Sequence, residues 1–132
     1  MELTSAHAAA LWSGLLIILL LVLSVMVVRQ RRKHRIAVGD GGAPELLQAI
    51  RAFGNATEYI PVGVGALAVL AVVGASPLAV HLTGVMLFAG RLIHAVGLSR
   101  TTGTSLGRTI GMSLTWLAYV FAAVALIFYG IV

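Results

Sequence analysis

The sequence predicts an all-α membrane protein in which four transmembrane helices form a single domain over residues 1–132. Hydrophobic residues make up 60% of the chain and charged residues only 10%, whereas soluble proteins carry roughly 25% charged residues. The apolar residues fall into four blocks, each near the roughly 20 residues that a helix needs to cross the hydrocarbon. Strand-like alternation of apolar and polar residues is absent, so a membrane barrel is not expected.

The helices are expected at about residues 6–33, 44–74, 77–98 and 106–131. Basic residues follow the first block rather than precede it, which favours a retained span over a cleaved signal peptide. Pro44 and Glu45 are typical of a helix start, and Ser76 before Pro77 predicts a tight hairpin in which Ser76 caps the third helix. Glycines within the spans are expected to serve close helix packing: Gly63, Gly65, Gly84, Gly90 and Gly97.

The basic residues predict how the chain is oriented. If the helices cross in alternation, all nine Lys and Arg residues fall on one side of the bundle. The positive-inside rule makes that side cytoplasmic and places both termini on the periplasmic face. The net charge of +5 then implies contact with anionic membrane lipids, and no nucleic-acid partner is expected.

The second helix carries a polar stripe of Arg51, Asn55 and Glu58. Since a helix turns about 100° per residue, Asn55 lies about 40° from Arg51 on one side and Glu58 about 20° on the other. Arg91 and His94, three residues apart, share a face of the third helix. Polar groups in a membrane helix are costly without partners, so these residues predict a functional site.

These side chains, with Tyr59 and Arg108, are expected at one level of the bilayer, because the third helix ends where the second begins. A purely structural alternative is an ion pair between Glu58 and Arg91 that holds the two helices together. The charged stripe must be hidden from lipid, so an oligomer is expected. The chain has no cysteine and no histidine–acid spacing typical of a metal site, so no metal is expected.

A motif in the second helix carries a family resemblance. The pattern Arg51-x-x-x-Asn55-x-x-Glu58-Tyr59-x-Pro61 resembles the helix-two signature of the MAPEG family, the membrane-associated proteins in eicosanoid and glutathione metabolism. Microsomal glutathione transferases belong to this family. The resemblance implies a homotrimer in a bacterial inner membrane, with glutathione bound as co-substrate between subunits near the cytoplasmic face.

Two further segments support the resemblance, which extends over nearly the whole chain. Residues 39–46 resemble the approach to helix two in small bacterial members, and residues 90–97 are similar to the end of helix three. Family members often carry tyrosines at the end of helix three, where this chain has His94 and Leu98. A hydroxyl that assists the sulfur is therefore missing, or its role falls to His94, which can act as a general acid or base.

The resemblance also implies roles for individual residues. The Arg and Asn of the motif would hold a carboxylate of glutathione and the Glu its amine. Arg108 would match the family's arginine that faces the sulfur, with Arg100 as the other candidate. A fixed cation near a helix N-terminus favours a thiolate over a thiol, whose ordinary pKa is about 8.5. The implied glutathione-binding residues are Arg51, Asn55, Glu58, Tyr59, Arg91 and His94.

The expected function is that of a membrane-bound glutathione transferase or peroxidase. The thiolate would attack a lipophilic electrophile that enters from the bilayer, or reduce a lipid hydroperoxide. One alternative is a non-catalytic lipid-binding scaffold of the same family, against which Arg108 argues. The other is a small four-helix efflux transporter in which Glu58 exchanges protons; neighbouring arginines that keep Glu58 ionised argue against it.

Overall fold

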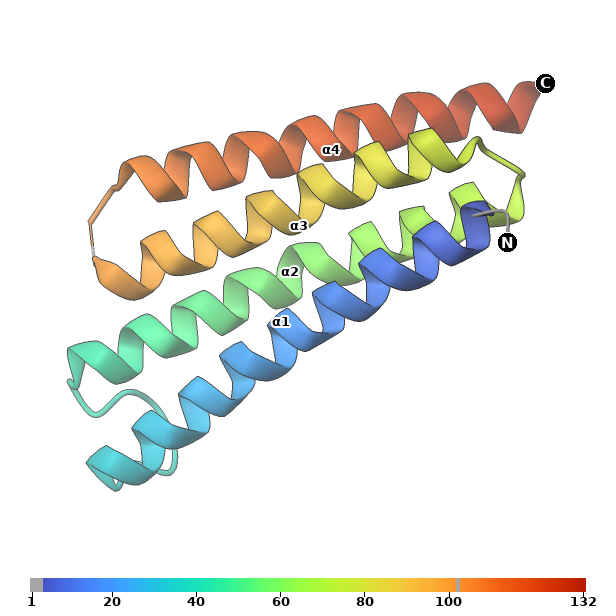
Figure 1. Ribbon diagram of the computed structural model, residues 1–132. Coiled ribbons are helices and arrows are strands. Elements are labelled where there is room, and N and C mark those ends of the chain that lie inside the picture. Colours follow the sequence, from blue (N-terminus) through green and yellow to red (C-terminus); the bar gives the residue numbers. More distant parts are fainter. Residues whose placement is uncertain (1–3, 102) are drawn as a thin grey trace.

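The computed structural model, which describes residues 4–101 and 103–132, is a bundle of four helices (Figure 1). Each is long and apolar enough to cross a membrane. The ends of α1 and α3 and the starts of α2 and α4 lie together at what we call the basic end, and the C-terminus lies at the other (Figure 1). The helices are α1 (Ser5–His34), α2 (Pro44–Val72), α3 (Pro77–Arg100) and α4 (Leu106–Ile131).

Caps fix the starts of α3 and α4. The Ser76 hydroxyl accepts a hydrogen bond from the backbone N–H of Ala79 at 3.3 Å, which is the predicted cap of α3. The Ser105 hydroxyl accepts from the backbone N–H of Arg108, also at 3.3 Å. Because Ser105 ends the loop, Arg108 lies in the first turn of α4.

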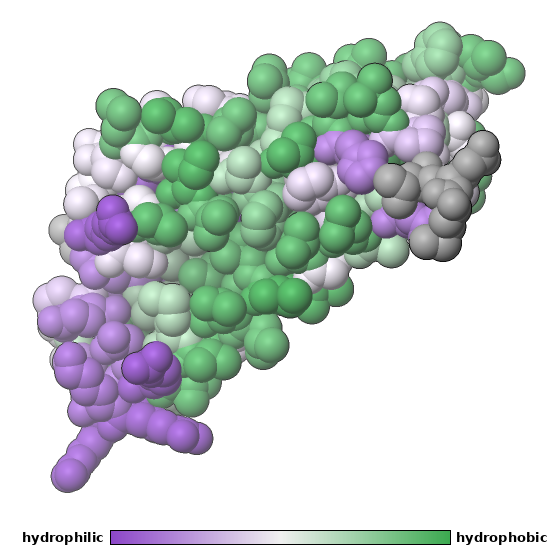
Figure 2. Space-filling model, in the orientation of Figure 1, coloured by the Kyte–Doolittle hydropathy of each residue, from purple (hydrophilic) through white to green (hydrophobic). Residues whose placement is uncertain are grey.

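The helices pack so that α2 and α3 form the middle of the bundle. Each of them contacts the other three helices, whereas α1 and α4 do not contact each other within the described residues. The bundle therefore has two broad faces, one with α2 and one with α3 between α1 and α4; we call them the α2 face and the α3 face. Hydrophilic side chains gather at the basic end, and hydrophobic ones cover much of the length (Figure 2).

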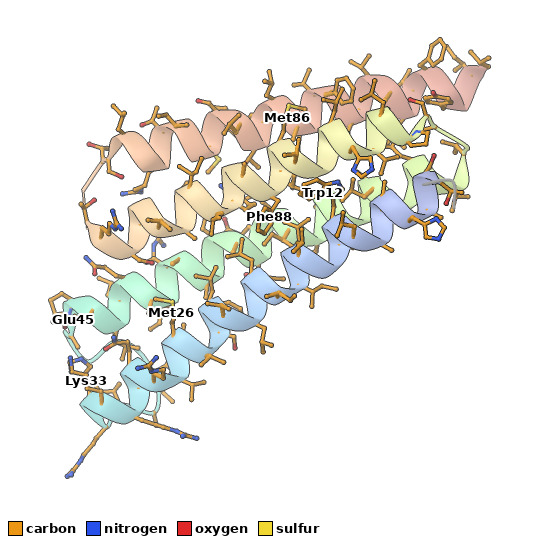
Figure 3. The ribbon with its side chains drawn as sticks, in the orientation of Figure 1. Trp12, Met26, Lys33, Glu45, Met86 and Phe88 are labelled. Atoms are coloured by element: carbon orange, nitrogen blue, oxygen red, sulfur yellow. The ribbon has the colours of Figure 1, made fainter. Side chains whose placement is uncertain are left out.

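Aromatic side chains join α1 to α3. The Trp12 ring lies 6.2 Å from the Phe88 ring between centroids, and its Nε1 donates to His81 Nδ1 at 3.0 Å (Figure 3). Gly84 faces the Trp12 ring so closely that a Cβ there would collide with it. The glycine makes room for the tryptophan.

Backbones of α3 and α4 approach closely at glycines. A Cβ on Gly111 would lie 2.6 Å from the Gly90 carbonyl oxygen, and one on Gly97 would lie 2.8 Å from the Arg108 nitrogen. Small residues allow such contacts between membrane helices. The packing role predicted for glycines is present at positions 63, 84, 90 and 97. The prediction is wrong for Gly65, because no atom of another helix lies within 4 Å of the position that its Cβ would take.

Gly111→Ala should destabilise the bundle, because the added methyl group would meet the backbone of α3 at His94 and Gly90. We expect a loss of about 1–3 kcal/mol, the usual cost of overpacking, measured by unfolding in mixed micelles. Gly130→Ala is the matched control on the same helix, since nothing lies within 4 Å of its Cβ position. Equal stability of the two variants would show that α3 and α4 separate without cost.

Candidate functional site

The Arg91 guanidinium is the centre of a buried polar cluster. Arg91 is 1% exposed, and its Nε donates to Thr115 Oγ1 at 3.0 Å. Its Nη1 donates to Asn55 Oδ1 at 2.7 Å, and its Cζ lies 4.8 Å from the centroid of the Tyr59 ring. Arg91 therefore joins α3 to both α2 and α4. Its Nη2 is buried and has no partner among the described residues, so one donor remains available.

A hydrogen bond within α4 orients the Thr115 hydroxyl for this contact. Its hydroxyl donates to the Gly111 carbonyl at 2.8 Å, so the oxygen lone pairs are free to accept from Arg91. Gly90, next to Arg91, lets Thr115 approach: a Cβ on Gly90 would lie 2.8 Å from Thr115 Oγ1. The packing of the two helices and the hydrogen bond of the arginine thus depend on the same glycines.

Tyr59 and Tyr119 border the cluster. The Tyr119 hydroxyl donates to the Tyr59 carbonyl, and the two ring centroids are 6.1 Å apart. Sequence reasoning missed both Tyr119 and Thr115. Their spacing was a signal, because residues four apart share a helix face, and here they share it with buried Ala118 and Ala122.

Glu58 is linked to Arg91 through Asn55 rather than directly. Asn55 accepts from Arg91 and its Nδ2 donates to Glu58 Oε2 at 3.5 Å. The direct ion pair considered from the sequence is therefore absent from the described residues, because the amide lies between the two charges. Glu58 is exposed on the protomer surface, midway along α2.

Arg51 and Arg108 line one hollow of about 350 Å³ at the basic end. Leu47 and Gln48 of α2 and Leu98 of α3 complete it. Within the part of the chain that the structure describes, neither arginine has a carboxylate within 4.0 Å. The Arg108 guanidinium donates to the Gly103 carbonyl. The sequence did not single out Gln48, although its place three residues before Arg51 puts both on one side of α2.

The predicted site residues thus divide into two groups rather than lying at one level. Arg51 and Arg108 share the hollow at the basic end, whereas Asn55, Tyr59 and Arg91 form the cluster deeper in the bundle. His94 is buried, with its backbone against Gly111, and its ring has no hydrogen-bond partner among the described residues. No set of three His, Asp or Glu side chains in the described ranges is arranged to hold a metal ion.

Arg100 lies apart from both groups. It lines two hollows with Leu92 and Val96 of α3 and does not line the one that holds Arg51. Of the two candidates for contact with a sulfur, only Arg108 faces the same space as Arg51.

The four apolar helices surround a polar cluster centred on the buried Arg91, and a hollow lined by two arginines lies at one end of the bundle. These features define an integral membrane protein. The chain belongs to the MAPEG family, whose family model matches residues 9–128, and the resemblance seen in the sequence is thereby confirmed. It is similar to the inner membrane protein YecN of Escherichia coli K12, with 40% identity over 121 residues, 92% of this chain and 91% of that protein. YecN of E. coli O6:H1 strain CFT073 matches to the same extent.

Thr115→Val should destabilise the protein by about 1–3 kcal/mol, the usual cost of leaving a buried donor unsatisfied. Valine keeps the shape of threonine but removes the acceptor of Arg91 Nε. Thr109→Val is the control, because Thr109 lies on the same helix with its hydroxyl exposed. The free energy of unfolding in mixed micelles measures both. If the two variants lose the same amount, Arg91 does not depend on Thr115.

Proposed function

We propose that this protein binds glutathione and holds its sulfur as a thiolate. The observation that carries the proposal is the hollow lined by Arg51 and Arg108, two cations from different helices with no carboxylate partner among the described residues. Glutathione supplies matching anions, two carboxylates and a thiolate. Membership of the MAPEG family supports a role related to glutathione or to lipid metabolism.

The position of Arg108 suits it to act on the sulfur. It lies in the first turn of α4, where the partial positive charge of the helix N-terminus adds to that of the guanidinium. Both favour the thiolate, which is the nucleophilic form of the thiol. Arg51 and Gln48, one turn apart on α2, would then hold a carboxylate of the same ligand.

The deeper cluster would support the ligand from the other side. Arg91 would act on the ligand through Asn55 rather than directly, because its unpartnered Nη2 is closed off from the surface of the protomer. Asn55, which contacts both Arg91 and Glu58, would keep these two charges in place, and Glu58 would receive the ligand amine. Tyr59 and His94 would border the ligand without providing its main charges.

Two reactions follow from a thiolate held at a membrane. With a lipophilic electrophile from the bilayer, a sulfur–carbon bond forms and the leaving group departs with its electron pair. With a lipid hydroperoxide, the sulfur takes the terminal oxygen and the O–O bond breaks, releasing the lipid alcohol after it gains a proton. The sulfenic acid then condenses with a second glutathione to give the disulfide and water.

We also propose a homotrimer in the inner membrane, with the ligand between subunits. Glu58 is exposed midway along α2, and a charge exposed to hydrocarbon at this depth is costly. A neighbouring copy packed on the α2 face would cover Glu58 and close the hollow around Arg51. The name of the E. coli relative supports the inner membrane, and the positive-inside rule supports a cytoplasmic basic end.

A glutathione titration of the detergent-purified protein, followed by thiolate ultraviolet absorbance, tests the proposed chemistry. Wild type should give a saturable signal, and Arg108→Gln should lose it while equilibrium dialysis still detects binding. Arg51→Gln should weaken binding about tenfold or more, because it removes a charge-assisted hydrogen bond. Arg32→Gln removes an exposed charge at the same end of the bundle and should behave as wild type.

Two results would contradict this assignment. A thiolate signal that survives in Arg108→Gln but is lost in Arg100→Gln would transfer the role to the other arginine. No thiolate in folded, oligomeric wild type would favour a lipid-binding scaffold instead.

Cross-linking tests the assembly, and the natural chain contains no cysteine to interfere. Val62→Cys on α2 is 60% exposed and lies one turn from Glu58, so a short bis-maleimide should join copies through it. Val85→Cys is the control on α3, where the residue is 43% exposed. Native mass spectrometry should find three times the mass of the chain. Cross-linking through position 85 and not 62 would assign the contact to the α3 face and refute the proposed arrangement.

A further inference from the structure

We propose that the α3 face binds a two-chain anionic phospholipid, with its phosphate at Arg100 and one acyl chain on each side of α3. This site lies on the other side of the bundle from the hollow of Arg51 and Arg108 and does not depend on the chemistry proposed there. Leu92, Val96 and Arg100 follow one another at intervals of four residues and form a ridge that runs toward the basic end.

A hollow lies on each side of this ridge. The one between α1 and α3 has a volume of about 290 Å³ and includes Val22 and Met26 of α1. The one between α3 and α4 has a volume of about 540 Å³ and includes Leu106 of α4. Both are lined by all three ridge residues. Two apolar grooves that meet at one cation match the shape of a lipid with two chains and one phosphate.

The arrangement of the helices leaves this ridge uncovered. Because α1 and α4 do not contact each other in the described ranges, they flank α3 without closing over it. Leu92 is 40% exposed and Val96 is 42% exposed. Apolar side chains between two helices offer acyl chains more contact than a smooth surface does, since attraction grows with the number of close atom pairs.

Charge selects an anionic headgroup. Arg100 is the last residue of α3 and its side chain has no hydrogen bond or ion pair within the described residues. On α1, Met26 and Lys33 lie toward the basic end (Figure 3). With Arg29 they line an adjoining hollow of about 430 Å³. None of the three cations is neutralised by a carboxylate in the part of the chain described. A phosphate would be held by the guanidinium fork, whereas a choline cation would be repelled.

Native mass spectrometry of the detergent-purified protein, titrated with phosphatidylglycerol or with phosphatidylcholine of the same chains, tests the site. Wild type should retain phosphatidylglycerol, up to one molecule per protomer, and retain phosphatidylcholine more weakly. Arg100→Gln should weaken phosphatidylglycerol retention about fivefold, which is the loss of affinity expected when one basic residue near an anionic surface is removed. Arg32→Gln, which removes the same charge outside these hollows, should have little effect. Equal losses in the two variants would overturn the site in favour of a diffuse basic surface.

The two grooves have tests of their own. Val96→Trp places a large side chain on the ridge, where the wild-type residue is already partly exposed, and should reduce retention of both lipids. Lyso-phosphatidylglycerol, with one chain, should bind more weakly than the two-chain lipid. If both forms bind equally, or if inorganic phosphate displaces the lipid, the ridge is not the acyl-chain site. None of these measurements requires glutathione, so a failed thiolate titration would leave the lipid site untouched.

Discussion

The burial of the Arg91 guanidinium is the constraint on which the rest of the structure depends. A cation inside a membrane bundle is stable only when other groups replace the water that it has lost. Here Thr115, Asn55 and the Tyr59 ring provide this replacement, each from a helix other than α3. These contacts require α3 and α4 to lie close together, and Gly90 makes that approach possible. The polar core and the glycine packing are therefore one feature of the bundle.

The same arginine organises charges outside the core. Asn55 uses its oxygen for Arg91 and its nitrogen for Glu58, so the buried cation and the exposed carboxylate are oriented by one amide. Oriented in this way, Glu58 remains on the α2 face, where only another copy or a polar ligand can cover it. On the opposite face, α3 offers apolar side chains that lipid covers without cost. The two faces thus differ in the partners that they suit, which is a physical reason to propose oligomerisation through α2.

The sequence predicted those features of the structure that depend on residues close together along the chain, namely the helix ends and the residues that share a helix face. The helix ends lie at most two residues from the predicted ones, because block length, Pro44, Ser76 and Pro77 act locally. The sequence also predicted that Arg51, Asn55 and Glu58 form a polar stripe on α2, since helical spacing determines which residues share a face. It did not predict which side chains meet across helices, so Asn55 was not placed between Glu58 and Arg91. The spacing showed that Thr115 and Tyr119 share a face of α4, but nothing along that helix showed that Thr115 would meet Arg91, and the functional roles remain predictions.

The choice between Arg100 and Arg108 shows what only the three-dimensional arrangement adds. Both lie at the basic end, eight positions apart, and sequence alone allows either to face a sulfur. Gly97 separates them, because its missing side chain lets α3 lie against the backbone of Arg108, where a Cβ would be 2.8 Å from the nitrogen. This contact holds the first turn of α4 against α3, and from there Arg108 lines the same hollow as Arg51 of α2. Arg100, nearly one turn beyond Gly97 on α3, lies on the α3 face. The close packing of two helices therefore leaves Arg108 in the hollow of Arg51 and Arg100 on the opposite face of the bundle.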